Sequence, residues 1–384
     1  MNDLKIDMHM HVGVVGDKWP EMGKMTSDYI SSPVFKSFQL FARIKNEEIN
    51  DLDLHRKTCE VICDPAKGAK RIDHVVCLAL APVYDKNGNE QLQSSKMWVS
   101  NRYVRKVCED TKGKALYGAS VHPYDPKFQE KVSECIKDGA VLLKWLPSAQ
   151  QIDLADKRVL EALRFLAQTK AGKSGKPLPL LLHVGPEYAI PTTCEKTKSY
   201  DYLSWGWMDK TSNFFRFGSK WFVPDLETIY ANLRAGLQAG AVIILAHCGL
   251  PYFAANIFGR ITEHSDFDIV KQLLRETLDK NKSGVTGQLY ADVSAFCTPM
   301  RKLYFDDVRE LPQECLLYGS DYPTPAFEIS ANKEEFWDDF KAIMRGEIDR
   351  IIIPEDNLLD VNERELRIAF GNSPLFTNFS KLIS

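Results

Sequence analysis

The sequence has no apolar run that approaches the roughly 20 residues needed to cross a bilayer. Its first apolar segment begins almost at Met1, which leaves no room for a secretory signal peptide. There is no CxxC pair among the nine scattered cysteines, and the formal net charge of -3 gives no basic excess. We therefore expect a cytoplasmic protein with reduced thiols that binds neither membranes nor nucleic acid.

Two common catalytic signatures are also missing. The stretches GAKR and GVTG match neither a P-loop nor a dinucleotide fingerprint, and no Gly-x-Ser-x-Gly elbow occurs. Nucleotide-binding and serine hydrolase interpretations therefore have no support. Because no internal repeat, low-complexity tract or Pro/Gly-rich linker divides the chain, we expect one domain over residues 1–384.

What the sequence does contain is a series of short runs rich in Val, Ile and Leu, separated by amphipathic, charged stretches. This alternation is typical of parallel strands joined by helices. Eight such units predict an α/β fold, a (β/α)8 barrel of the TIM type. The predicted strands are Leu4–Val12, His74–Ala81, Ala115–His122, Ala140–Leu146, Leu178–Val184, Ala241–Cys248, Gln288–Ala295 and Cys315–Asp321. The predicted helices include Ser32–Arg43, Asn50–Cys63, Lys96–Thr111, Pro126–Asp138, Asp156–Lys170, Asp225–Ala239 and Asp266–Lys280.

Two connections are too long to be plain links, namely Gly13–Arg71 after the first strand and Gly185–Pro224 after the fifth. Long ordered loops tend to be functional, and both follow the carboxyl end of a strand, where barrel enzymes place their sites. The second connection is dense in aromatic residues. It is either a lid over residues 186–224 or a helical excursion that packs on the barrel or on a second subunit, as in a homo-oligomer.

The stretch KIDMHMHVG, which overlaps the first predicted strand, carries His9 and His11 with one residue between them. Side chains two apart in a strand lie on the same face, so both imidazoles should point one way. The apolar residues at positions 6, 8, 10 and 12 should then occupy the opposite face. An isolated HxH pair is more often part of an ordinary buried strand whose histidines are satisfied by hydrogen bonds. The residues at the ends of the other predicted strands therefore have to decide between the two interpretations.

Polar residues end four other predicted strands that are otherwise nearly all apolar, at Lys144, His183, His247 and Asp321. The carboxyl ends of barrel strands face a common pocket, and a neutral imidazole buried among leucines needs partners for both nitrogens. A divalent cation would be a shared partner. His9, His11, His183 and Asp321 make a three-imidazole, one-carboxylate set that suits Zn²⁺ and tolerates Mn²⁺, Ni²⁺ or Fe²⁺.

This pattern of strand ends resembles the amidohydrolase superfamily. The stretches KWLPSAQQID, HVGPE, AHCGLP, YGSDYP and FGNSPLF are similar to its amidohydrolase-related branch, which includes the aminocarboxymuconate semialdehyde decarboxylase-like proteins. The resemblance implies that His9, His11 and His183 bind the metal and that Asp321 binds it or accepts a proton from its water. It also implies that His247 is a second-metal ligand or an acid/base and oxyanion-polarising group.

Three further residues have alternative interpretations. In dinuclear members of the superfamily a strand-four lysine can be carboxylated to bridge two ions, and KWLP resembles that context, but an unmodified Lys144 would salt-bridge or anchor an anionic substrate. One ion or two therefore both stay open. His122 either lines the pocket or caps a turn before Pro123, and Glu187 either reaches the substrate or metal or is a solvated loop carboxylate.

Together these residues predict a metal-dependent hydrolase. A bound ion would lower the pKa of its water, Asp321 would take the proton and pass it to the leaving group, and His247 would stabilise the oxyanion. The expected substrate is a small, carboxylated or cyclic molecule cleaved at a C–N, C–O or C–C bond. Non-oxidative decarboxylation at the same site and a catalytically inert metal-binding scaffold are the alternatives.

Overall fold

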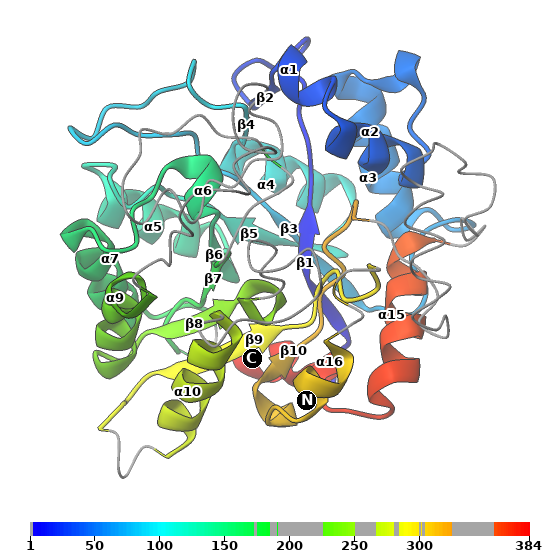
Figure 1. The fold of residues 1–384 in the computed structure, drawn as a ribbon. Helices are drawn as coiled ribbons and strands as arrows, with labels where there is room; N and C mark the ends of the chain where they lie inside the picture. The colour runs from blue at the N-terminus through cyan, green and yellow to red at the C-terminus, as the bar shows by residue number, and fades with distance from the viewer. Residues whose placement is uncertain are drawn as a thin grey trace, which may run out of the picture.

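Eight parallel strands curve into a barrel in the computed structural model, in the order β1-β3-β5-β6-β7-β8-β9-β10 (Figure 1). The structure describes residues 3–172, 175–184, 190, 226–249, 266–279, 284–298, 301, 304–324 and 357–384. The barrel closes where β1 meets β10, because the N–H of Met8 donates to the carbonyl of Tyr318 over 3.1 Å and that of His11 to Tyr322 over 2.8 Å. The predicted (β/α)8 fold is confirmed.

All eight predicted strands are present, each shorter than the apolar run that predicted it. The last residues of most runs leave the hydrogen-bonded ladder and turn at one end of the barrel, which we call the mouth. The strands are β1 (Ile6–His11), β3 (His74–Leu78), β5 (Ala115–Ala119), β6 (Leu142–Trp145), β7 (Leu180–Leu182), β8 (Val242–Leu245), β9 (Gln288–Asp292) and β10 (Leu316–Leu317).

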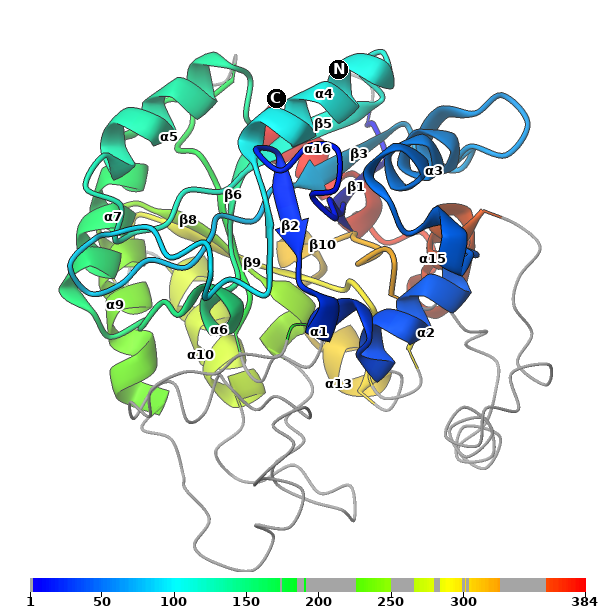
Figure 2. The same cartoon turned by 90° about the horizontal axis from the view of Figure 1, so that it is seen from above.

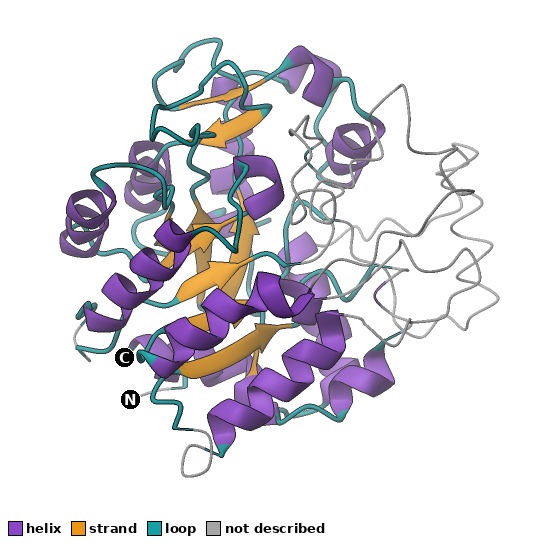
Figure 3. Cartoon of the chain, turned by 60° about the vertical axis from the view of Figure 1, so that its left-hand side comes forward, coloured by secondary structure: helices purple, strands orange, loops and turns teal. Residues whose placement is uncertain are grey.

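Helices cover the outside of the strands (Figures 2 and 3). Polar N-cap side chains begin several of them, as where Ser100 and Asp156 accept backbone N–H groups of the following turn. The helices that follow barrel strands are α4 (Asn101–Asp110), α5 (Phe128–Lys137), α6 (Pro147–Gln150), α7 (Lys157–Gln168), α9 (Leu226–Gln238), α10 (Asp266–Leu278), α13 (Phe305–Arg309), α15 (Leu358–Phe370) and α16 (Leu375–Ile383).

Apolar side chains form two buried layers. The larger lies between strands and helices and takes residues such as Val75, Leu143 and Ile243. The smaller fills the barrel interior, because it draws on alternate positions of the strands, and Phe379 and Leu382 of α16 close it from below. Its strand members are Ile6, Met8, Val76, Leu78, Leu142, Leu181, Val242, Ile244 and Leu317.

The face assignment expected for the first strand is wrong in part. The pairing of β1 with β3 shifts by one residue between Asp7 and Met10, which is a β-bulge. Because the bulge inverts the alternation, Ile6 and Met8 point into the barrel, whereas Met10 joins the outer layer. The N–H of His9 bonds instead to the carboxylate of Asp7 over 3.1 Å.

The first long connection builds a small subdomain over one side of the mouth. It contains β2 (Gly23–Met25), α1 (Ser27–Ile30), α2 (Pro33–Phe41) and α3 (Asp51–Cys63), so the expected helices are confirmed. β2 pairs antiparallel with β4 (Met97–Val99). The helix predicted from Lys96 therefore begins only at Asn101, because the residues before it extend to pair with β2.

A single buried carboxylate organises the start of that connection. Asp51, at the first turn of α3, accepts the backbone N–H groups of Val15, Gly16, Lys18 and Trp19 at 2.7–2.9 Å. Four such bonds hold the pKa of Asp51 below its usual range, although burial acts to raise it. The chain leaving β1 is thereby fixed against α3.

The second long connection, with the proposed lid at 186–224 and Glu187, lies outside the described residues apart from residue 190. None of the helices that the structure describes combines the length and apolar character needed to span a bilayer. The eight cysteines within the described part of the chain are free thiols.

Candidate metal centre at the mouth of the barrel

Two histidines and one aspartate meet at the seam that closes the barrel. His9 and His11 come from β1, and Asp321 follows β10, where its N–H donates to the carbonyl of His9 over 2.8 Å. The Nε2 atoms of the two histidines lie 3.2 Å apart. Oδ1 of Asp321 lies 3.4 Å from Nε2 of His9 and 3.2 Å from that of His11.

These three atoms fit a divalent cation. Two ligand atoms bound at about 2.0–2.1 Å in tetrahedral geometry lie about 3.3 Å from each other. The three observed separations of 3.2–3.4 Å match that value. The set of two imidazoles and one carboxylate is also a donor set that zinc and related ions accept.

The outer nitrogen of His9 is held by an aspartate from β9. Nδ1 of His9 lies 2.8 Å from Oδ2 of Asp292, and both side chains are fully buried. Because the carboxylate can only accept, Nδ1 carries the proton, which leaves a lone pair on Nε2 facing His11 and Asp321. A carboxylate that orients a metal-binding imidazole in this way also raises its basicity.

Ser294 links this aspartate to a third histidine. Its hydroxyl donates to Oδ1 of Asp292 and lies 3.0 Å from Nδ1 of His9 and 2.8 Å from Nδ1 of His247. A second group of potential ligands, His9, His247 and Asp292, surrounds this hydroxyl. Since the hydroxyl already occupies the space between them, this second group is a hydrogen-bond network.

His247 follows β8 and presents its other nitrogen toward Asp321. Its Nδ1 lies 3.0 Å from the backbone carbonyl of Ser294, an acceptor only, so Nδ1 carries the proton. Nε2 is then the unprotonated nitrogen and lies 3.9 Å from Oδ2 of Asp321. The imidazole stacks on His9, with ring centroids 5.3 Å apart.

Lys144 contacts His9 of the cluster directly, whereas His183 contacts His247. Lys144 is almost completely buried at the end of β6, and its Nζ lies 3.2 Å from Nε2 of His9. A protonated Lys144 and a divalent cation would therefore compete for the same lone pair. His183 follows β7 and contacts the ring of His247 edge-on, with centroids 5.2 Å apart.

The protonation states at neutral pH are those that metal ligands need. Burial, then the ammonium group of Lys144, lower the pKa of His9 to about 4, and burial, then Arg301, lower the pKa of His247 well below its usual value. For Asp321 burial acts to raise the pKa, but the neighbouring histidines outweigh it and hold the pKa well below the usual range. The imidazoles of His9 and His247 are thus neutral and the carboxylate of Asp321 is ionised.

The backbone around the cluster adopts conformations that non-glycine residues seldom take. The φ angles of His247, Cys248 and Ala295 are each 55°, and that of Asp321 is 60°. Such left-handed residues tend to gather at functional sites. Gly319 shows how tightly the seam is packed, because a Cβ there would lie 2.7 Å from Cβ of His9.

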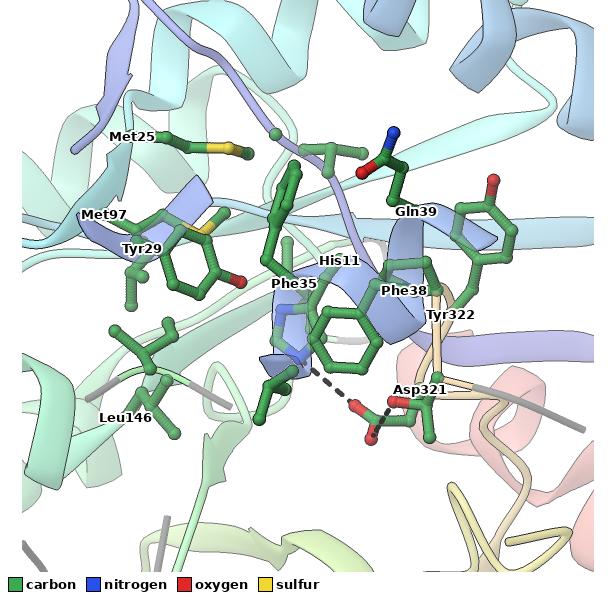
Figure 4. A pocket seen from close by; sticks show the side chains of 18 of the residues that line it. His11, Met25, Tyr29, Phe35, Phe38, Gln39, Met97, Leu146, Asp321 and Tyr322 are labelled. Carbon is green, nitrogen blue, oxygen red and sulfur yellow. Dashed lines mark hydrogen bonds and ion pairs between the residues drawn. The ribbon is translucent and has the colours of Figure 1, made fainter. Parts of the chain in front are cut away.

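A cavity of about 310 Å³ opens beside the cluster (Figure 4). His11, His183, His247 and Asp321 line it at the mouth, together with Arg301. Figure 4 shows the contact between His11 and Asp321, which both line the cavity, as a dashed line. The site therefore combines a candidate metal centre with space for a small molecule.

His122 is not among the residues that line this cavity. Its Nε2 donates to the carbonyl of Gln150 over 2.8 Å, and its Nδ1 accepts the N–H of Tyr124 over 3.1 Å. Both nitrogens are thus engaged by the backbone, as in the turn-capping alternative. The other pocket candidate, Glu187, lies outside the described residues.

The sequence analysis missed Asp292 and Ser294. Asp292 ends β9 and Ser294 follows it, in the stretch QLYADVS, where polar residues end an apolar run just as in the other strands. The rule that selected Lys144, His183 and His247 applies equally to this strand. Asp292 and Ser294 were therefore recoverable from the same signal.

The chain matches no protein-family model and no curated protein sequence. Among solved structures, it is similar to a zinc-bound amidohydrolase from Burkholderia multivorans, with 10% identity, a TM-score of 0.42, and 96% of this chain and 99% of that one covered. It is also similar to a probable 2-pyrone-4,6-dicarboxylic acid hydrolase from Acinetobacter baumannii, with 15% identity and a TM-score of 0.37, and 94% of this chain and 100% of that one are covered. The similarity to 5-carboxyvanillate decarboxylase from Sphingomonas paucimobilis has 11% identity and a TM-score of 0.39, and it covers 96% of this chain and 98% of that one.

The structural neighbours are thus amidohydrolase-type proteins that include both hydrolases and decarboxylases. The assignment of the barrel rests on the strand order and closure described above.

Proposed function

We propose that this protein is a metal-dependent hydrolase that cleaves a C–N, C–O or C–C bond of a small carboxylated or cyclic substrate. The observation that carries the proposal is the group of three donor atoms, on His9, His11 and Asp321, that lie 3.2–3.4 Å apart beside a cavity. His183 is the proposed further ligand. A divalent ion in such a site supplies an activated water and polarises a carbonyl oxygen.

The side chains around the cavity have distinct proposed roles. Asp321, whose Oδ2 accepts the hydroxyl of Thr324 over 2.9 Å, is ionised and can take a proton from the attacking water. His247 has its unprotonated Nε2 near Asp321, so it can receive that proton and deliver it to the leaving group. Arg301 supplies a positive charge for a substrate carboxylate or for a developing oxyanion.

A second candidate is non-oxidative decarboxylation at the same centre. The apolar wall of the cavity favours it, because a carboxylate loses hydration there whereas the product CO₂ is uncharged. In this reaction the electron pair left by CO₂ would take a proton that Asp321 draws from a water and passes to Nε2 of His247, and hydroxide would be left behind.

One experiment tests both candidates. The protein is stripped of metal with a chelator, reloaded with Zn²⁺ or Mn²⁺, and assayed against lactones, amides and unsaturated carboxylic acids. We expect a lactone or amide to yield a new carboxylic acid, and we expect turnover to disappear on chelation and return with the ion. Release of CO₂ without hydrolysis would favour the decarboxylase, and activity that survives complete metal removal would refute the metal centre.

A further inference from the structure

The two ends of the cavity differ in chemistry. Charged and polar groups line it next to the cluster, as described above. Met25 of β2, Tyr29 of α1 and Met97 of β4 line the opposite end, and Phe35 of α2 and Leu54 of α3 also belong to the wall of the cavity. In Figure 4, Met25, Tyr29 and Met97 lie on the side of the cavity away from Asp321.

Three further polar side chains that line the cavity have partners within the protein. The amide nitrogen of Gln39 donates to Oδ1 of Asn46 over 2.8 Å, and the hydroxyl of Thr58 donates to the carbonyl of Leu54 over 2.8 Å. The ammonium group of Lys57 donates to the carbonyl of Arg43 over 3.0 Å and lies 3.3 Å from Glu48. A ligand at the apolar end opposite the cluster therefore gains free energy from burial of apolar surface.

The cavity has room for an occupant larger than a carboxylate. Ligand pockets bury most of the surface of the molecule that they bind, so the volume of the cavity indicates the size of a ligand that would fill it. The volume of about 310 Å³ is about twice the roughly 150 Å³ of an engineered cavity that holds benzene. It therefore takes about a dozen non-hydrogen atoms in all, which is a head group of about four atoms and an apolar tail of about eight carbon atoms.

We propose that the substrate is an amphipathic acid derivative, with a carbonyl-bearing head at the metal centre and an apolar tail between β2, α1, α2 and β4. The position of the head rests on the proposed function. The tail site rests only on the walls of the cavity, so its binding energy is independent of any ion. The subdomain after β1 thereby acts as the specificity element of the barrel.

Straight-chain hydroxamic acids with two to twelve carbons are suitable probes, because the head chelates zinc and the tail varies. Their Kd values are measured by calorimetry on the metal-free and the zinc-loaded protein. We expect affinity to rise about fourfold per methylene in both forms, the increment for burying one CH₂ group, and to level off once the cavity is full. Zinc should tighten binding of every chain length by a similar factor.

The dependence of Kd on chain length and the effect of zinc on Kd test the two proposals separately. A dependence on chain length with no effect of zinc supports the tail site and refutes the metal centre. An effect of zinc without dependence on chain length supports the metal centre and overturns the tail site. Kd values that respond to neither overturn both.

A matched pair of variants locates the tail. Met25→Trp fills the apolar end and should weaken binding of the eight-carbon probe at least tenfold while leaving the two-carbon probe unchanged. Met22→Trp is the control, because Met22 is as buried, at 8% against 9% exposed, but does not line the cavity. Phe35→Ala should instead move the plateau to longer chains. Equal effects of Met25→Trp on short and long probes, or an unmoved plateau in Phe35→Ala, would place the tail elsewhere and overturn the assignment.

Discussion

The two ends of the barrel both bury charged groups, but in opposite ways. The end opposite the mouth, where β1 and β3 begin, is called the floor. At the floor, Glu363 of α15 is fully buried, and each of its oxygens has a cationic partner, with Arg71 Nε at 2.6 Å and Arg367 Nε at 2.7 Å. At the mouth, Nε2 of His9, Nε2 of His11 and Oδ1 of Asp321 face one another instead. Charges that are paired within the protein need no further partner, whereas donor atoms that converge on one point suit a shared ligand.

The largest effect expected from this comparison is the loss of activity in Asp321→Asn. An amide of the same shape is a weak metal ligand and cannot take a proton. Turnover should fall about 10³-fold or more, the scale on which groups that stabilise the transition state act. Circular dichroism and the melting temperature should change little.

The control for this variant is Asp125→Asn. Asp125 is also buried and accepts the hydroxyl of Tyr84 over 2.9 Å, but it lies outside the cavity wall. It should keep full turnover. If Asp321→Asn retains activity, the assignment of Asp321 as ligand and base is wrong.

The next effect concerns the support behind the ligands. In Asp292→Asn the amide would turn its NH₂ group toward Nδ1 of His9 and force the proton onto Nε2, the nitrogen that should bind the ion. Zinc affinity, measured by competition with a chromophoric chelator, should fall about 10–100-fold. Nitrogen-15 NMR of the histidine rings should report the change of tautomer.

Ser294→Ala is the milder variant to compare with Asp292→Asn, because it removes the hydroxyl but leaves the carboxylate of Asp292 in place. It should retain the tautomer of His9 and lose less affinity than Asp292→Asn. Unchanged affinity and tautomer in Asp292→Asn would show that His9 is oriented by packing alone.

At the floor, the same kind of substitution should affect stability instead of chemistry. Glu363→Gln removes the charge that pairs with Arg71 and Arg367. Because those two side chains are 44% and 30% exposed and can be hydrated, we expect a loss of about 2 kcal/mol in the free energy of unfolding, below the value for a fully buried pair. Guanidinium denaturation measures this loss, and kcat should stay at the wild-type value. A decrease in kcat per folded molecule would mean that floor and mouth are coupled.

The smallest expected effect concerns His122, whose two ring nitrogens both have hydrogen-bond partners within the protein, in contrast to the histidines at the mouth. Burial lowers the pKa of His122 to about 3, so the folded protein keeps it neutral while the unfolded chain protonates it below about pH 6.5. Protons then favour unfolding, and His122 alone should lower the stability by about 1.4 kcal/mol per pH unit as the pH falls through this range.

The measurement is the free energy of unfolding at several pH values in wild type and in His122→Gln, which can still donate and accept. In the variant, the free energy of unfolding should depend less steeply on pH, by about 1.4 kcal/mol per pH unit, which is the contribution of one proton. Identical slopes would mean that His122 is protonated in the folded protein.

Much of the fold was predictable, because each barrel strand is a buried apolar run that differs from its charged flanks. The shift in β1 was not, since IDMHMH contains neither glycine nor proline to indicate a bulge. The pair β2 and β4 was also missed. Strands of three residues are too short to show an alternating pattern.

The candidate site was predictable as far as residue types at strand ends go. His122 and His247 carry the same sequence signal, a histidine at the end of an apolar run, yet only His247 meets the cluster. The difference lies in the carbonyl of Gln150, which accepts a hydrogen bond from Nε2 of His122. Tertiary packing brings this carbonyl to the histidine. Such a partner cannot be read from the sequence around His122.

The closing seam between β1 and β10 joins the beginning of the chain to a segment near its end, since Ser320 donates to Asp7 across 313 residues. His9 and His11 are therefore synthesised more than 300 residues before Asp321. A chain that stops before Asp321 would lack one of the three proposed ligands. If the proposed centre binds an ion, all three side chains could hold that ion only after β1 and β10 have met.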